Sequence, residues 1–180
     1  MASVVFLRAV NVGGANRCKP AEIAKELKKF DVVNIGAVGT FVVRNEVTES
    51  SLRSAIAKKL PFKCDIMIVP GRDILKLADE DPFADHPPAA NITRFVNVLA
   101  RPLRPAPALP LALPSANDWL IKIIAVHGQF VLGIYKREMK AIAYLGKIEK
   151  HLGIPATNRN WNTIEKVVQI LNTSARGAGG

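Results

Sequence analysis

The sequence predicts an α+β protein made of two ferredoxin-like halves, residues 1–85 and residues 86–180, that are related by duplication. The first half reads as strand, helix, strand, strand, helix, strand and helix, which is the split β-α-β order with one further helix. The second half repeats this order, except that a Pro-rich loop replaces its first helix. Equivalent elements lie 88, 88 and 91 residues apart, and this near-constant offset indicates a repeated unit.

Alternation and helical spacing give the elements of the first half. The apolar run Val4–Leu7 predicts the first strand, which leads into a turn at Asn11–Gly14. Residues 19–30 predict a helix, because Ile23 and Leu27 fall on one face and lysines lie opposite. The other predicted elements are a helix at 48–60, a short helix at 72–80, and strands at 32–38, 40–45 and 64–70.

The second half is interrupted by prolines. Segment 102–114 contains five of them, which exclude a continuous helix because proline lacks an N–H donor and clashes with the preceding turn. Gly153 is expected to end the helix that precedes it. The predicted elements are strands at 92–100, 119–128, 129–137 and 155–161, and helices at 140–153 and 162–172.

Composition and length restrict the class of protein. The chain has 180 residues, of which 49% are hydrophobic, enough for a substantial core without a metal or disulfides. Its two cysteines, Cys18 and Cys64, form no CxxC motif, so the sequence predicts no metal site, no cofactor and a reducing cytoplasmic location. The first residues lack the basic start and cleavage pattern of a signal peptide. No apolar run approaches the roughly 18 residues that a membrane span requires.

The net charge of +10 is unevenly distributed along the sequence. Residues 1–90 carry +2, whereas residues 91–180 carry +8. A basic half is typical of proteins that bind nucleic acid or a phosphorylated small molecule, and it is also typical of charge that only maintains solubility. The aromatic pattern of RNA-binding strands is missing, since Phe41 and Phe130 stand alone.

Three stretches resemble a bacterial family known as the domain of unknown function number sixteen-ninety-seven. Residues 6–23, FLRAVNVGGANRCKPAEI, resemble its opening Leu-Arg-Gly-Ile-Asn-Val-Gly-Gly motif. Residues 37–44, AVGTFVVR, stand where the family has Ser-Gly-Asn-Val-Val-Phe, and residues 155–167 resemble its closing Arg-Asn-Trp-Asn-Thr signature. The resemblance implies a two-part fold of ferredoxin-like halves and supplies no activity.

Two departures from the family pattern are notable. Ala9 and Val10 replace Gly-Ile in the opening motif, which is a mild change. Val38-Gly39-Thr40 replaces Ser-Gly-Asn, so a site that used that Ser and Asn would be partly lost here.

The first candidate site consists of Arg8, Asn11, Gly13 and Gly14. A strand followed by Asn and two glycines can expose backbone N–H groups to an anion, with Arg8 adding positive charge. The stretch is neither a GxGxxG motif nor a Walker loop. It is more typical of a structural turn, in which the glycines adopt positive φ and Asn11 bonds nearby backbone.

The second candidate site is Asn158, Arg159 and Asn160. Alternation in a strand would place Asn158 and Asn160 on one face and Arg159 on the other. A surface Arg flanked by amides could bind phosphate or carboxylate, and it could equally bond loop carbonyls. The next residues, Asn162 to Glu165, have the spacing of a capping box for the last helix.

Catalytic residues cannot be assigned, because no carboxylate pair and no Ser/His/Asp arrangement stands out. Three hypotheses follow. In the first, the protein binds a phosphorylated or anionic ligand, with nucleic acid as one candidate, through its basic half. Alternatively, it is an enzyme or metabolite binder with a site between the halves, formed by Arg8–Gly14 and Asn158–Asn160. In the third, the Pro-rich segment 102–114 binds a protein partner, or else covers apolar surface left by the missing helix.

Overall fold

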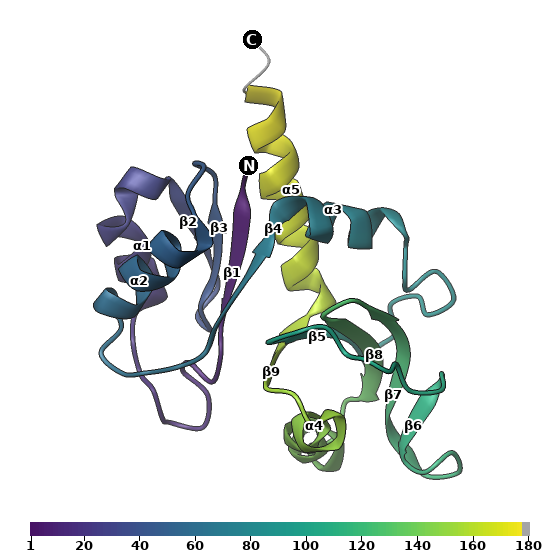
Figure 1. Ribbon diagram of the computed structural model, residues 1–180. Coiled ribbons are helices and arrows are strands. Elements are labelled where there is room, and N and C mark those ends of the chain that lie inside the picture. The colour runs from purple at the N-terminus through teal and green to yellow at the C-terminus, as the bar shows by residue number, and fades with distance from the viewer. Residues whose placement is uncertain (178–180) are drawn as a thin grey trace. The chain divides into compact units, whose positions relative to one another are not determined.

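The computed structural model describes residues 1–177 and divides into two compact units (Figure 1). The first unit consists of Met1–Asp79 together with the C-terminal helix from Asn162 onward, and the second consists of Glu80–Trp161. Each unit contains one antiparallel sheet with helices, so the protein is α+β as the sequence predicts. The predicted division after residue 85 concerns two repeated halves of the sequence, and it stays a prediction.

The sheet of the first unit has four strands in the order β2-β3-β1-β4. The strand β1 is central, so Val5 lies opposite Phe41 on one side and Ile68 on the other. Val4–Leu7 are all fully buried, so both faces of β1 are covered, and this explains the uninterrupted apolar run of the sequence. The strands are β1 (Ser3–Leu7), β2 (Val32–Ile35), β3 (Thr40–Val43) and β4 (Ile66–Pro70).

Two helices, α1 (Pro20–Glu26) and α2 (Glu49–Lys59), cover one face of this sheet (Figure 1). They bury the apolar stripes that the sequence shows against side chains from β1 and β3; the cluster includes Val5, Leu7, Phe41, Val43, Ile23, Leu27, Leu52 and Ile56. Thr48 caps α2, where its side-chain oxygen accepts the N–H of Ser51 at 3.3 Å.

The first helix is shorter than predicted. It ends at Glu26 and is followed by a 3-10 turn, η1 (Lys28–Phe30), which stops at Asp31 with φ 53°. The predicted end of the strand at Pro70–Gly71 is confirmed, since β4 ends at Pro70 and α3 (Gly71–Asp79) follows at once. A Cβ at Gly71 would lie 2.9 Å from Leu171 Cδ2 of the C-terminal helix and 3.1 Å from the carbonyl oxygen of Ala2, so these neighbours would have to shift to admit a side chain.

That C-terminal helix, α5 (Trp161–Gly177), begins one residue earlier than predicted. Asn162 therefore lies within the first turn and is not the N-cap, so the predicted capping box does not have the expected positions. Trp161 is 6% exposed and anchors the start of the helix, since its ring meets Phe83 edge-on with centroids 5.0 Å apart.

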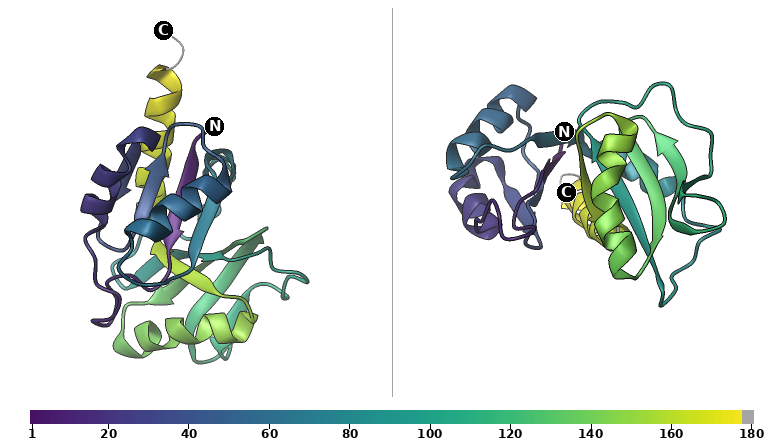
Figure 2. Two further views of the ribbon diagram at one scale, coloured as in Figure 1. Left: turned by 60° about the vertical axis from the view of Figure 1, so that its left-hand side comes forward. Right: turned by 90° about the horizontal axis from the view of Figure 1, so that it is seen from below.

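The sheet of the second unit has five strands in the order β6-β7-β8-β5-β9. The helix α4 (Met139–Leu152) lies across one face of it (Figure 2), where its buried Ile148 packs with Phe95 and Ile121. Gly153 ends α4 with φ 68°, as predicted. The strands are β5 (Ile92–Leu99), β6 (Leu111–Pro114), β7 (Trp119–His127), β8 (Phe130–Lys136) and β9 (Ala156–Asn160).

The sequence predicts that the Pro-rich segment is a loop throughout, but part of it forms a strand. Its last part is the edge strand β6, in which Leu113 pairs with Ile121 of β7. An edge position tolerates proline because one side of the strand needs no N–H donor. Leu103, Leu111 and Leu113 pack in one cluster with Ile123 and Val131, so the segment covers apolar sheet surface.

The charge asymmetry of the sequence does not persist in the compact units. The first unit has 15 Lys and Arg residues against 9 Asp and Glu residues, and the second has 10 against 6. The reason is that Glu80, Asp81 and Asp85 belong to the second unit, whereas the C-terminal helix belongs to the first. Both units are therefore basic.

Candidate functional site

The first predicted site forms a tight loop after β1. Arg8 is half-buried, its Nη1 lies 3.1 Å from Asp65 Oδ2, and its backbone N–H donates to the carbonyl of Asp65 at 3.0 Å. This guanidinium therefore already has a carboxylate partner, and an anionic ligand would have to share it.

Asn11 holds the loop together through its amide group. Its Nδ2 donates to the carbonyls of Cys18 at 2.9 Å and Ala37 at 2.7 Å, while its Oδ1 accepts the N–H of Cys18 at 2.9 Å. Gly13 and Gly14 have φ values of 62° and 79°, the left-handed conformation expected of a structural turn. The contacts of Asn11 fit a structural role, and anion binding by this loop stays a prediction.

The second predicted site lies on β9, and the alternation of its side chains is as predicted. Asn158 Nδ2 donates to Asn97 Oδ1 at 3.0 Å, and Asn160 is exposed. Arg159 lies on the other face and is only 5% exposed, so it is not the surface Arg of the binding hypothesis. Its Nη1 donates to Thr157 Oγ1 and to the carbonyl of Asn158, both at 2.7 Å.

Burial lowers the pKa of Arg159 to about 10, because removal from water disfavours the charged form. The side chain remains cationic at neutral pH. The two predicted sites belong to different units, and each unit has its own sheet. A shared site formed by Arg8–Gly14 and Asn158–Asn160 therefore stays a prediction.

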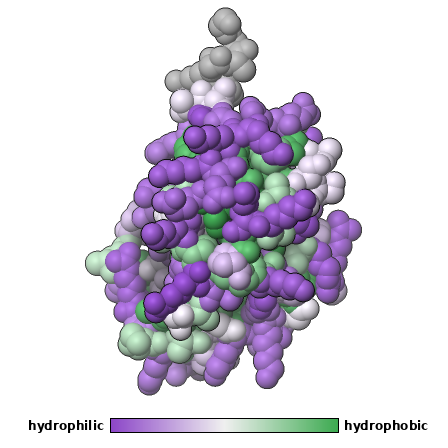
Figure 3. Space-filling view, turned by 90° about the vertical axis from the view of Figure 1, so that its left-hand side faces the viewer, coloured by the Kyte–Doolittle hydropathy of each residue, from purple (hydrophilic) through white to green (hydrophobic). Residues whose placement is uncertain are grey.

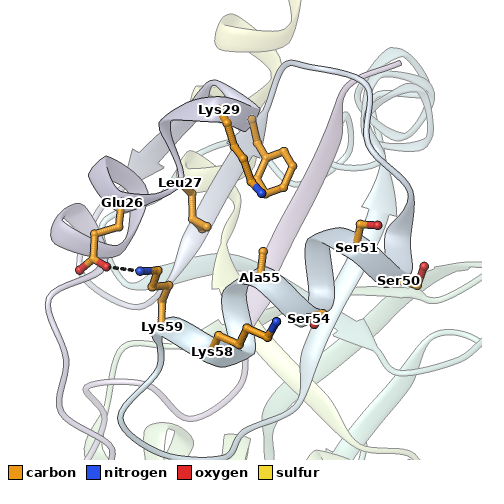
Figure 4. Close-up of a pocket in the computed structure, with 10 residues that line it drawn as sticks. Glu26, Leu27, Lys29, Ser50, Ser51, Ser54, Ala55, Lys58 and Lys59 are labelled. Atoms are coloured by element: carbon orange, nitrogen blue, oxygen red, sulfur yellow. Dashed lines mark ion pairs between the residues drawn. The ribbon is translucent and has the colours of Figure 1, made fainter.

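A pocket that the sequence did not predict lies between α1 and α2 of the first unit (Figure 4). Its volume is about 560 Å³, within the usual range for small-molecule sites. Figure 3 views the side of the first unit on which α1 and α2 lie, and hydrophilic side chains dominate this face, with apolar atoms visible between them. The lining residues are Glu26, Leu27, Lys29 and Phe30 from α1 and η1, and Ser50, Ser51, Ser54, Ala55, Lys58 and Lys59 from α2.

Positive charge predominates in this pocket, which we call the α1–α2 pocket. Its wall has three lysines and one carboxylate. Lys59 Nζ is paired with Glu26 Oε2 at 2.7 Å, and Lys29 Nζ lies 4.7 Å from the centroid of the Phe30 ring. Lys58 has no ion-pair partner among residues 1–177. An anion in the pocket would therefore meet two ammonium groups that no carboxylate neutralises.

Hydroxyl groups and apolar atoms complete the wall. Ser50, Ser54 and Lys58 follow one another at four-residue intervals, so they form a stripe along α2. Leu27 is 2% exposed and lies at the apolar side of the pocket with Ala55 and Phe30. The arrangement provides cationic donors, hydroxyl donors and apolar contacts in one pocket.

The α1–α2 pocket shows no catalytic arrangement. No cluster of His, Cys, Asp or Glu suited to a metal ion occurs in the part of the chain that the structure describes. Its serines lack an adjacent histidine or carboxylate base, since the only carboxylate of the wall is paired with Lys59. The sequence contains one signal for this pocket, the stripe Ser50-Ser54-Lys58 on the polar face of a predicted helix.

No helix within residues 1–177 combines the length and the apolar character needed to cross a membrane. The family described as "Protein of unknown function (DUF1697)" matches residues 1–118, more than half of the chain. This protein belongs to that family, as the resemblance of its motifs predicted.

One solved structure is similar over almost the whole chain. It is a conserved bacterial protein, SP0830, from Streptococcus pneumoniae, with a TM-score of 0.59 and 16% sequence identity. The similarity covers 94% of this chain and 98% of the other. At this identity the likeness shows a shared fold alone. No curated protein sequence matches this one.

Proposed function

We propose that this protein binds a phosphorylated or otherwise anionic small molecule in the α1–α2 pocket. The observation that carries the proposal is the composition of its wall: three lysines and three serines face a cavity of about 560 Å³ that has only one carboxylate. Phosphate oxygens accept hydrogen bonds from ammonium and hydroxyl groups, and such charge-assisted bonds are about twice as strong as neutral ones.

The size of the cavity and its apolar side favour an organic phosphate. A phosphate group would be held near Lys58 and Ser54, one helical turn apart on α2. The rest of the ligand would contact Phe30, Leu27 and Ala55. Because the carboxylate of Glu26 already binds Lys59, it does not oppose the ligand with a free negative charge.

The test is a titration of the full chain with adenosine monophosphate and ribose 5-phosphate, followed by amide chemical shifts. We expect the shifts to concentrate on α2 and η1, and adenosine without phosphate to cause none there. Lys58→Gln should weaken binding about tenfold, which corresponds to ~1.4 kcal/mol. Ser54→Ala tests the hydroxyl contact in the same way.

Lys63→Gln is the matched control, because Lys63 is an exposed lysine of the same unit that does not line the pocket. It should leave the affinity unchanged. Equal losses for Lys58→Gln and Lys63→Gln would mean that only net charge matters, and shifts located away from α2 and η1 would place the ligand elsewhere. Either result contradicts the proposal.

We further propose that both units are ferredoxin-like and arose by duplication. The order of elements supports this: β1-α1-β2-β3-α2-β4 forms a sheet β2-β3-β1-β4. In the second unit, β5, β7, β8 and β9 correspond along the chain to β1, β2, β3 and β4, and their order in the sheet, β7-β8-β5-β9, is the equivalent one. The helix α4 lies between β8 and β9 along the chain, and β6 is added at the edge of the sheet. An experimental structure with a different strand order in either sheet would contradict this assignment.

A cytoplasmic location is the proposal that best fits the cysteines. Cys18 and Cys64 are both free thiols, and both are half-buried beside the core of the first unit. Free thiols persist in reducing compartments. Cell fractionation with antibodies to the native protein tests the location.

A further inference from the structure

The second unit contains an aromatic ring that two cations approach. Lys122 Nζ lies 4.3 Å from the centroid of the Trp119 ring, and Lys136 Nζ lies 4.8 Å from it. The two ammonium nitrogens are therefore at most about 9 Å apart. Trp119 and Lys122 belong to β7, and Lys136 ends β8, so three side chains from two neighbouring strands form what we call the Trp119 cluster.

The register of the strands places the two lysines on the face of the sheet opposite to α4. Lys122 pairs with Ile134, and Lys136, two residues further along β8, points to the same face. The neighbouring Ile121 points the other way, into the cluster that contains Ile148 of α4. The helix of this unit therefore does not cover the lysines, and all three side chains of the Trp119 cluster are only half-buried.

The electrostatics of the Trp119 cluster favour a negatively charged partner. Neither lysine has a carboxylate within ion-pair distance among residues 1–177, so their mutual repulsion is offset only by the aromatic ring. Other cation–aromatic pairs of the protein differ. Lys147 approaches Tyr144 alone, and the Phe83 ring beneath Arg94 is 2% exposed.

We infer that the Trp119 cluster binds single-stranded nucleic acid. A base stacks on the indole of Trp119, and the adjoining phosphates bind Lys122 and Lys136. Stacking on an aromatic ring tolerates any base, and cations track the backbone, so the binding has little sequence preference. The inference uses the second unit only and does not depend on the α1–α2 pocket.

The other aromatic candidates in the strands are unsuited to this role. Phe41 is fully buried and Phe130 is 5% exposed, so neither ring can reach a base. Trp119 was not recognised from the sequence, because its two lysines lie 3 and 17 residues away and meet it only through the pairing of β7 with β8.

The test measures fluorescence anisotropy of labelled single-stranded DNA of about 12 nucleotides with the full chain. An abasic strand of equal length has the same phosphates without bases, and a DNA duplex has its bases already stacked. We expect the normal single strand to bind most tightly. Trp119→Ala should weaken its binding about 5- to 150-fold, the range for loss of one stacked base. The same substitution should barely change binding of the abasic strand.

Charge is tested separately by Lys122→Gln and Lys136→Gln over a salt series. Each substitution should reduce the slope of log K against log salt by about 0.7. Lys147→Gln is the matched control, because Lys147 also lies over an aromatic ring but faces no second cation, and it should leave the slope unchanged. Trp119→Phe keeps an aromatic ring and should retain part of the preference for the normal strand, which distinguishes stacking from a folding defect.

Three results would overturn the inference. Equal binding of normal and abasic strands would show that phosphate attraction alone operates. An equal effect of Lys147→Gln and Lys122→Gln would show that binding depends on the overall positive charge and not on the Trp119 cluster. Absence of binding at about 50 mM salt, where phosphate attraction is strong, would exclude this partner altogether.

Discussion

Gly39→Ala is expected to destabilise the first unit for two reasons that the structure separates. Gly39 has φ 80°, a conformation that costs an L-residue about 1–2 kcal/mol. An added Cβ would also lie 2.7 Å from Cβ and Cδ1 of Leu7, a fully buried residue of β1. Leu7 cannot retreat, so overpacking adds about 1–3 kcal/mol.

Alanine also reduces the conformational entropy of the unfolded chain, which raises the free energy of unfolding by about 0.4–1 kcal/mol. The net loss is therefore ~2–4 kcal/mol. Gly13→Ala provides the control, because Gly13 has φ 62° but its added Cβ would meet no atom within 4 Å. There the conformational strain and the effect on the unfolded chain nearly cancel, and the loss should be ~0–1 kcal/mol.

The measurements are differential scanning calorimetry and urea denaturation, and far-ultraviolet circular dichroism monitors the denaturation. Tryptophan fluorescence is unsuitable, because Trp119 and Trp161 both belong to the second unit. For a unit of this size the midpoint should fall by about 10–25 °C in Gly39→Ala and by a few degrees in Gly13→Ala. Equal losses in the two variants would refute the steric argument, since only the contact with Leu7 distinguishes them.

Three further predictions concern other parts of the chain. Ala9→Gly should stabilise the protein by about 0.5–1 kcal/mol in urea denaturation, because Ala9 has φ 56°, a conformation that glycine adopts without steric strain; a loss would contradict this. Leu113→Ala should cost about 2–5 kcal/mol, because Leu113 is 3% exposed; a negligible loss would favour the partner-binding hypothesis for the Pro-rich segment. Burial raises the pKa of the Cys18 and Cys64 thiols, so a smaller fraction is thiolate at neutral pH. The rate of alkylation by iodoacetamide should therefore begin to rise at a higher pH in the folded protein than in the urea-unfolded protein; coincident pH profiles would contradict the effect of burial.

Much of the fold could be predicted because the core leaves a periodic pattern in the sequence. Val4–Leu7 is apolar throughout because both faces of β1 are buried, and Leu52 and Ile56 recur at helical spacing because α2 covers that sheet. The errors fall where the pattern is weak. Leu111–Pro114 forms a strand because β7 offers an unpaired edge, and nothing within those four residues indicates that partner.

The candidate residues show a different limitation. Asn11 and its glycines were identified as a polar turn, and the structure gives the Asn11 side chain three hydrogen bonds to the backbone of its surroundings. Arg159 was identified from its charge, yet it is buried and bonds Thr157 and Asn158. Polar identity can be read from the sequence, whereas exposure depends on what the fold places over the residue.

The two proposed binding surfaces were overlooked for a physical reason that they share. Lys58 lines one pocket with Lys29 and Phe30 of η1, and Lys122 and Lys136 approach the same Trp119 ring, although these residues belong to elements that are separate in the sequence. The arrangement of each site therefore depends on strand register and helix packing, while local patterns report only the apolar face that makes the packing possible. Polar faces opposite a strong apolar stripe were treated as solvated surface, which is the usual case. A concentration of cations with few carboxylates distinguishes these two surfaces, and it can be recognised only after neighbouring elements have been placed side by side.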